Sequence, residues 1–89
     1  MRTGAFGIVL KQSVLKEIRR IPVIMLERIR SHIAALAENP FPAGVEKIQG
    51  YDDCYRIRVG QYRVVYQVSD AIHIITIIRI GHRREVYRF

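Results

Sequence analysis

The stretch that decides the fold is residues 55–66, which reads YRIRVGQYRVVY. Apolar and polar residues alternate on both sides of Gly60 and Gln61, as they do in two strands joined by a tight turn. A two-residue loop there would pair Arg58 with Arg63. The alternation therefore predicts a β-hairpin with one apolar face and one face of arginine. The apolar face would hold Tyr55, Ile57, Val59, Tyr62, Val64 and Tyr66, and the other face Arg56, Arg58 and Arg63.

The arginine face of this hairpin predicts an anionic ligand. Like charges directly opposite each other in an antiparallel pair destabilise it. A sheet that pairs Arg58 with Arg63 is therefore expected to meet a negatively charged group at that point.

The chain as a whole is basic and has the length of one domain, residues 1–89. Its formal net charge is +7 and its pI is about 10.2. Arginine outnumbers lysine 12 to 3, and the planar fork of arginine suits phosphate. This balance predicts a polyanionic partner, most often nucleic acid, and the alternative is a basic surface that serves solubility.

Several other classes of protein do not fit the sequence. Cys54 is the only cysteine, so no intrachain disulfide can form, and a reducing compartment is expected. No stretch approaches the roughly 20 apolar residues of a membrane span, which predicts a cytoplasmic protein. His32, His73 and His82 lack metal-ligand spacing, and the chain has no glycine-rich phosphate loop. We therefore expect no metal and no cofactor.

The order of elements predicts an α+β fold. Residues 5–10 form a short apolar run typical of a strand, and helical periodicity follows over residues 13–20 and 22–38. Residues 43–50 are expected to be irregular. Strands are predicted over 54–59, 62–68 and 71–80, the last of them buried on both faces. The predicted architecture is β-α-α-β-β-β, a two-helix hairpin packed on one face of an antiparallel sheet, with a short basic tail at residues 82–89.

The basic residues of the last strand and the tail are expected to join the hairpin. In an antiparallel meander, the Gly81 end of the last strand lies near the Gly60 turn. Guanidinium groups for phosphates and a tyrosine ring for a base would make an RNA site. The alternative is a solvated basic face with Tyr87 as a packing anchor. The residues that would join are Arg79, His82, Arg83, Arg84, Tyr87 and Arg88.

Two segments carry a resemblance to a known family. They are LAENPFPAGVEKIQGYDDCYRIRVGQYRVVYQV, residues 36–68, and IGHRREVYRF, residues 80–89. In these segments the chain resembles the RelE/ParE superfamily of bacterial and archaeal toxins, and the RelE branch is the closer match. The resemblance implies a toxin that enters the ribosomal A site, inhibits translation and cuts mRNA without a metal, by attack of the substrate's own 2′-hydroxyl on the adjacent phosphate.

The resemblance also implies roles for individual residues. Arg63 and Arg83 would hold the scissile phosphate, and Tyr87 would stack on the substrate base. Arg56 and Arg58 would bind flanking phosphates or ribosomal RNA. The remaining basic residues of this end of the chain, expected to add RNA and ribosome contacts, are Arg79, Arg84 and Arg88.

The identity of the general base stays open in this comparison. RelE members carry lysines where this chain has Arg56 and Arg58, and arginine is a poor base near neutrality because its pKa lies far above neutral pH. Histidine is the side chain whose ordinary pKa lies near 6.5, and His82 lies between Gly81 and Arg83. We therefore hypothesise that His82 shares the acid–base work, and the alternative is that it only packs at the strand end.

Other functions and a protein partner follow from the same resemblance. One alternative is a ParE-like toxin that inhibits DNA gyrase by binding, and another is a non-enzymatic module that binds nucleic acid through charge. The implied partners are mRNA, the 16S rRNA of the ribosome, and a RelB-like antitoxin encoded by the adjacent gene. Acidic, amphipathic antitoxin segments would cover the basic face or displace the tail in a hetero-oligomer.

Overall fold

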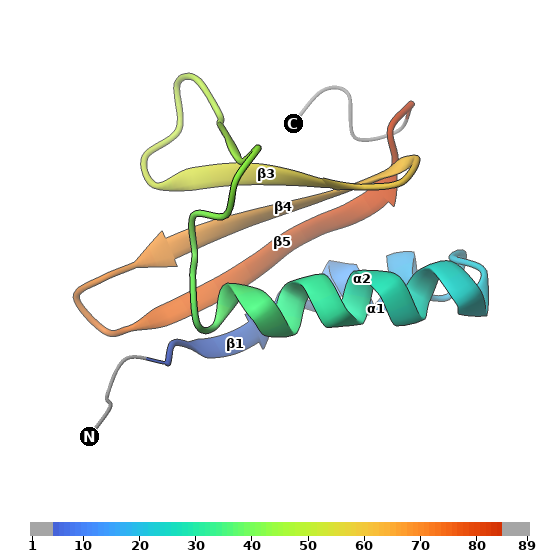
Figure 1. The fold of residues 1–89 in the computed structure, drawn as a ribbon, viewed down its shortest axis with the longest axis horizontal. Coiled ribbons are helices and arrows are strands. Elements are labelled where there is room, and N and C mark those ends of the chain that lie inside the picture. The colour runs from blue at the N-terminus through green and yellow to red at the C-terminus, as the bar shows by residue number, and fades with distance from the viewer. Residues whose placement is uncertain (1–4, 85–89) are drawn as a thin grey trace.

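The computed structural model describes residues 5–84, which form two helices and a five-stranded sheet. Figure 1 shows α2 running along the long strands of the sheet, with α1 largely behind it in this view. The predicted α+β class and the order of the predicted elements are confirmed. The elements are β1 (Gly7–Leu10), α1 (Gln12–Ile18), α2 (Val23–Leu36), β2 (Glu46–Lys47), β3 (Cys54–Val59), β4 (Tyr62–Ser69) and β5 (Ile74–His82).

The sheet has the strand order β1-β5-β4-β3-β2 and is mixed. Strands β3, β4 and β5 pair antiparallel, as predicted, and β2 pairs antiparallel with β3, whereas β1 pairs parallel to β5. The prediction of a wholly antiparallel sheet was therefore wrong at β1, because the sequence does not say beside which strand the first one docks. Strand β2 also lies in a segment that was expected to be irregular, since two residues are too few to show an alternating pattern.

The β3–β4 hairpin has the predicted register. Val59 pairs with Tyr62 and Arg58 with Arg63 across a loop of two residues. Gly60, the first loop residue, has a φ of 61°, a backbone conformation that glycine adopts without steric cost. This turn fixes which residues of the two strands face each other.

Strand β5 differs from its prediction in its ends and in its burial. It spans Ile74–His82 rather than residues 71–80, because a turn occupies residues 70–73 and Gly81 pairs with Arg63 instead of ending the strand. Its register shifts opposite Val65 and Tyr66, so that Arg79 pairs with Val65 and Ile77 with Tyr66. The strand is fully buried on the helix side only. The core residues there are Ile75, Ile77 and Ile80.

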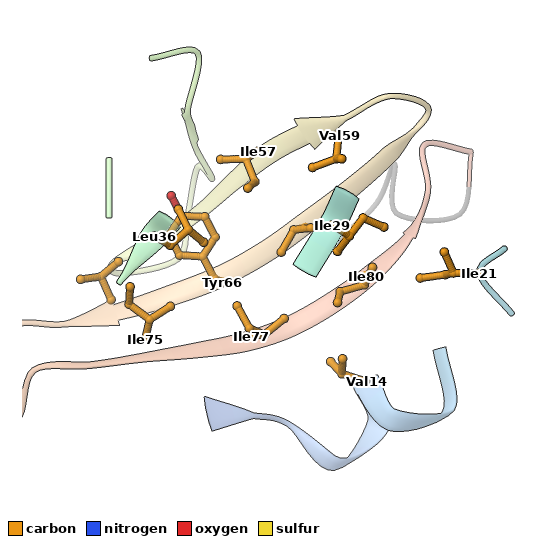
Figure 2. Close-up of a cluster of buried hydrophobic side chains, with 12 residues drawn as sticks. Val14, Ile21, Ile29, Leu36, Ile57, Val59, Tyr66, Ile75, Ile77 and Ile80 are labelled. Carbon is orange, nitrogen blue, oxygen red and sulfur yellow. The ribbon is translucent and has the colours of Figure 1, made fainter. Parts of the chain in front are cut away.

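The core lies between the sheet and the two helices (Figure 2). Val14 comes from α1, Ile29 and Leu36 come from the apolar stripe of α2, and all three are almost fully buried. Tyr66 is the largest fully buried side chain, and its hydroxyl donates a hydrogen bond of 2.6 Å to the carbonyl oxygen of Pro40. Burial raises the pKa of the Tyr66 hydroxyl far above its ordinary value. This bond ties the end of α2 to the centre of the sheet.

Replacing Tyr66 with phenylalanine tests that connection. Tyr66→Phe leaves the buried Pro40 carbonyl without its donor, so we expect the free energy of unfolding to fall by about 1.5 kcal/mol in urea titrations at pH 7. Tyr62→Phe is the matched control on the same strand, because its ring contacts His82 and its hydroxyl has no hydrogen-bond partner among residues 5–84. Equal losses in the two variants would contradict this role.

The same variant has a predicted pH signature. In the wild type, the unfolded chain ionises Tyr66 near pH 10 while the folded chain keeps it neutral, so this contribution to stability is present below pH 10 and is lost as the pH rises further. As the pH rises above 10, the free energy of unfolding of Tyr66→Phe should therefore fall less than that of the wild type.

Candidate nucleic-acid interface

Three arginines share the face of the sheet opposite the core. The flanking residues Ile57, Val59 and Val64 are buried on the helix side, so alternation along β3 and β4 directs the intervening side chains away from it. This face carries Arg56, Arg58 and Arg63, as predicted.

Arg58 and Arg63 stand directly opposite each other in the ladder. Arg63 Nη1 donates hydrogen bonds to the carbonyl oxygens of Tyr62 at 3.0 Å and Gly60 at 3.4 Å, which hold the guanidinium over the turn. The pKa of Arg63 is lowered from its ordinary value, first by burial and then by the positive charges of Arg58, Arg56 and Arg83. The fold therefore gathers four guanidinium groups against their mutual repulsion.

The end of β5 brings the beginning of the tail to this cluster. Figure 1 shows the β3–β4 turn beside the end of β5. Gly81 pairs with Arg63, and the backbone N–H of Arg83 donates a 2.7 Å hydrogen bond to the carbonyl of Gln61. Arg83 therefore lies close enough to influence Arg63, as expected. Arg84 is exposed one residue further along.

Glu46 is the member of the site that sequence reasoning missed. It pairs with Arg56 across the β2–β3 ladder. Its Oε1 lies 3.1 Å from Arg56 Nε and 3.0 Å from Arg56 Nη2, and its Oε2 lies 3.7 Å from Arg58 Nη2. The signal was weak, because a single acid in an irregular segment does not indicate a strand.

The structure places His82 on the other side of the sheet from Arg63. His82 pairs with Tyr62, and their rings meet edge to face with centroids 5.6 Å apart. Both line a cleft of about 510 Å³ against the end of α1, together with Arg20 and Ile21. The backbone N–H of the exposed Arg84 donates to His82 Nδ1 at 3.3 Å. These contacts hold the imidazole away from the arginine cluster.

Arg79 is engaged by α1 rather than by the cluster. Its Nε lies 3.5 Å from Glu17 Oε2, and Glu17 Oε1 accepts a 2.8 Å hydrogen bond from the backbone N–H of Ile80. The Glu17 carboxylate thus contacts the edge of β5 at Ile80, beyond the point where the pairing of β5 with β1 ends. The predicted RNA role of Arg79 therefore has to compete with this ion pair.

Two predicted site residues, Tyr87 and Arg88, lie outside the described residues. Within residues 5–84, no group of three His, Cys, Asp or Glu side chains is placed to hold a metal ion. Cys54 is buried, and burial raises the pKa of its thiol. In the same part of the chain, no helix is long and apolar enough to cross a membrane.

Comparison with known proteins identifies the family. The family model described as the ParE toxin of the type II toxin–antitoxin system parDE matches residues 8–87. The chain belongs to the RelE/ParE toxin family. It is 32% identical over 80 residues to the mRNA interferase toxin RelE of Escherichia coli K12, an alignment that covers 85% of this chain and 83% of the relative. It is 29% identical over 82 residues to toxin RelE3 of Methanocaldococcus jannaschii, covering 88% and 91%.

Solved structures of RelE proteins share the fold. The isolated E. coli RelE toxin superposes with a TM-score of 0.78 at 31% identity, covering 93% of this chain and 92% of that one. The RelE–RelB complex from Pyrococcus horikoshii gives a TM-score of 0.79 at 27% identity, with coverages of 89% and 96%. The chain is thus a RelE-type toxin of a toxin–antitoxin system.

The repulsion within the cluster predicts that an arginine there costs stability. Arg63→Gln removes the charge that Arg58, Arg56 and Arg83 oppose, so we expect the free energy of unfolding to rise by about 0.5 kcal/mol at low salt. The gain should shrink at 0.5 M NaCl, because salt screens exposed charges. Urea titrations at both salt concentrations measure it.

Arg30→Gln, on the exposed side of α2, is the control and should change stability little at either salt concentration. A salt-independent loss of stability in Arg63→Gln would contradict the repulsion.

Proposed function

We propose that this RelE-type toxin is a ribosome-dependent endoribonuclease that cuts mRNA in the A site. The observation that carries the proposal is the gathering of Arg58, Arg63 and Arg83 at one end of the sheet, against their repulsion. A phosphate group would relieve that repulsion. The relatives named mRNA interferase, with about a third of their residues identical, support RNA as the source of the phosphate.

The proposed reaction is the attack of the substrate 2′-hydroxyl on the adjacent phosphorus. The O2′–P bond forms, the P–O5′ bond breaks, and negative charge builds on the non-bridging oxygens. Arg63 and Arg83 hold the phosphate and stabilise that charge, and Arg58 adds positive potential beside it. Tyr87 is proposed to stack on the substrate base.

The reaction also needs a base that takes the proton of the 2′-hydroxyl and an acid that protonates the leaving O5′. Arginine is a poor base near neutral pH, and His82 points toward Tyr62 on the helix side. A role of His82 in proton transfer stays a prediction, and it requires the ring to leave the cleft when substrate binds.

The cleavage proposal is tested by toeprinting on translating ribosomes. The wild type should produce discrete cuts within A-site codons, and Arg83→Ala should reduce single-turnover cleavage by about 100-fold, because a charge-stabilising donor is lost. Arg30→Ala is the matched surface control and should cleave like the wild type. His82→Ala decides the proton-transfer hypothesis, which fails if its rate stays within a few-fold of the wild type. A wild-type protein that leaves every codon intact would contradict the proposed activity.

A second candidate function is inhibition of DNA gyrase by binding, because the matching family model bears the ParE description. The two candidate functions predict different experimental results. Gyrase-dependent DNA damage without mRNA cuts would favour it, whereas A-site cuts in a system without gyrase would exclude it.

We also propose that an antitoxin holds this toxin inactive. RelE proteins of P. horikoshii and E. coli have been solved in complex with RelB. The net charge of +7 favours an acidic partner, and the exposed guanidinium of Arg58 offers it an anchor.

The product of the neighbouring gene is the expected antitoxin. Adding it should raise the melting temperature, since a ligand that binds only the folded state stabilises that state, and it should block cleavage. Differential scanning calorimetry and the toeprint measure the two effects. A neighbouring product that changes neither would contradict the pairing.

A further inference from the structure

The two arginines of β3 occupy unlike surroundings although they share one face of one strand. The side chain of Arg56 is 30% exposed, and two of its nitrogens contact Glu46 at 3.0 and 3.1 Å. The side chain of Arg58 is 65% exposed, and its ion pair with Glu46 spans 3.7 Å, beyond hydrogen-bond length. Glu46 therefore binds one arginine firmly and the other loosely.

The register of the sheet explains this difference. Glu46 pairs with Arg56 in the β2–β3 ladder, so the backbone itself sets the carboxylate beside that guanidinium. Hydrogen bonds between two charged groups are stronger than those between neutral groups, and salt screens a partly buried pair less than an exposed one. A phosphate that approached Arg56 would have to displace Glu46 first.

Arg58 has the opposite position in the cluster. It stands directly across the ladder from Arg63, whose pKa is lowered partly by that neighbour. A phosphate between the two guanidinium groups would contact both and remove their repulsion. Glu46 lies one strand further away, and it reaches this pair only through its 3.7 Å contact with Arg58.

We propose that Glu46 gives the two β3 arginines different functions, with Arg56 a positioning residue locked to Glu46 and Arg58 the β3 ligand of an RNA phosphate. The inference rests on the proposed function in taking RNA as the ligand. It adds that one strand supplies one phosphate contact rather than two. It also gives Glu46 a function, which is to keep Arg56 from competing with Arg58 for the phosphate.

The salt dependence of RNA binding counts these contacts. For single strands, the slope of log K against log salt changes by about 0.7 for each phosphate that a basic side chain neutralises. A short single-stranded oligouridylate is titrated against the wild type and each variant between 50 and 200 mM NaCl, which are about the salt concentrations over which such slopes are resolved. Circular dichroism checks that every variant is folded.

The proposal predicts changes of opposite sign for neighbouring residues. Arg58→Gln should make the slope shallower by about 0.7, whereas Arg56→Gln should leave it unchanged. Glu46→Gln should make it steeper by about 0.7, because it releases Arg56 to bind a phosphate. The double variant Glu46→Gln with Arg56→Gln should return to the wild-type slope. A purely structural role of Glu46 would not produce this gain and its reversal.

Other outcomes overturn the proposal. Equal losses of slope in Arg56→Gln and Arg58→Gln would show two equivalent ligands, and an unchanged slope in Glu46→Gln would show that it does not restrain Arg56. If the wild type does not bind the oligonucleotide at any of these salt concentrations, Arg58 is not a ligand of an RNA phosphate. The ribosome toeprint is independent of these slopes. Predicted slopes without cleavage would refute the endonuclease alone, and cleavage with two equivalent arginines would refute the division of roles alone.

Discussion

The structure depends on the two-residue turn between β3 and β4. The turn sets a register in which Arg58 faces Arg63, and the repulsion at Arg63 follows from that pairing. The apolar residues between the arginines are committed to the core, so the arginines cannot leave the open face without exposing Ile57 or Val64. The core therefore keeps Arg58 opposite Arg63, whereas an isolated hairpin would relieve their repulsion by shifting its register.

Much of this could be predicted from the sequence because it is local. Alternation along residues 55–66 predicts the two strands, the turn and the register together, and the spacing of Ile29 and Leu36 predicts the buried side of α2. The approach of Arg83 to Arg63 followed from meander geometry alone.

The features that could not be predicted are those set by contacts between distant segments. The parallel docking of β1 on β5, the ion pair of Glu17 with Arg79, and the pairing of Glu46 with Arg56 depend on where the chain returns after its helices and loops. His82 was proposed for proton transfer because histidine ordinarily titrates near neutral pH. Strand alternation instead directs its ring toward Tyr62. The residue types thus predicted the kind of site better than they predicted which residues belong to it.

The fold bears a repulsion at Arg63, and we propose that an RNA phosphate relieves it. Measuring the free energy of unfolding of the wild type and of Arg63→Gln over a titration of single-stranded RNA at low salt tests it most directly. A ligand of the folded state adds stability as its concentration rises. We expect the variant to be more stable than the wild type without RNA, the wild type to gain more stability from RNA, and the two curves to converge and cross. Parallel curves, with equal gains from RNA, would contradict it.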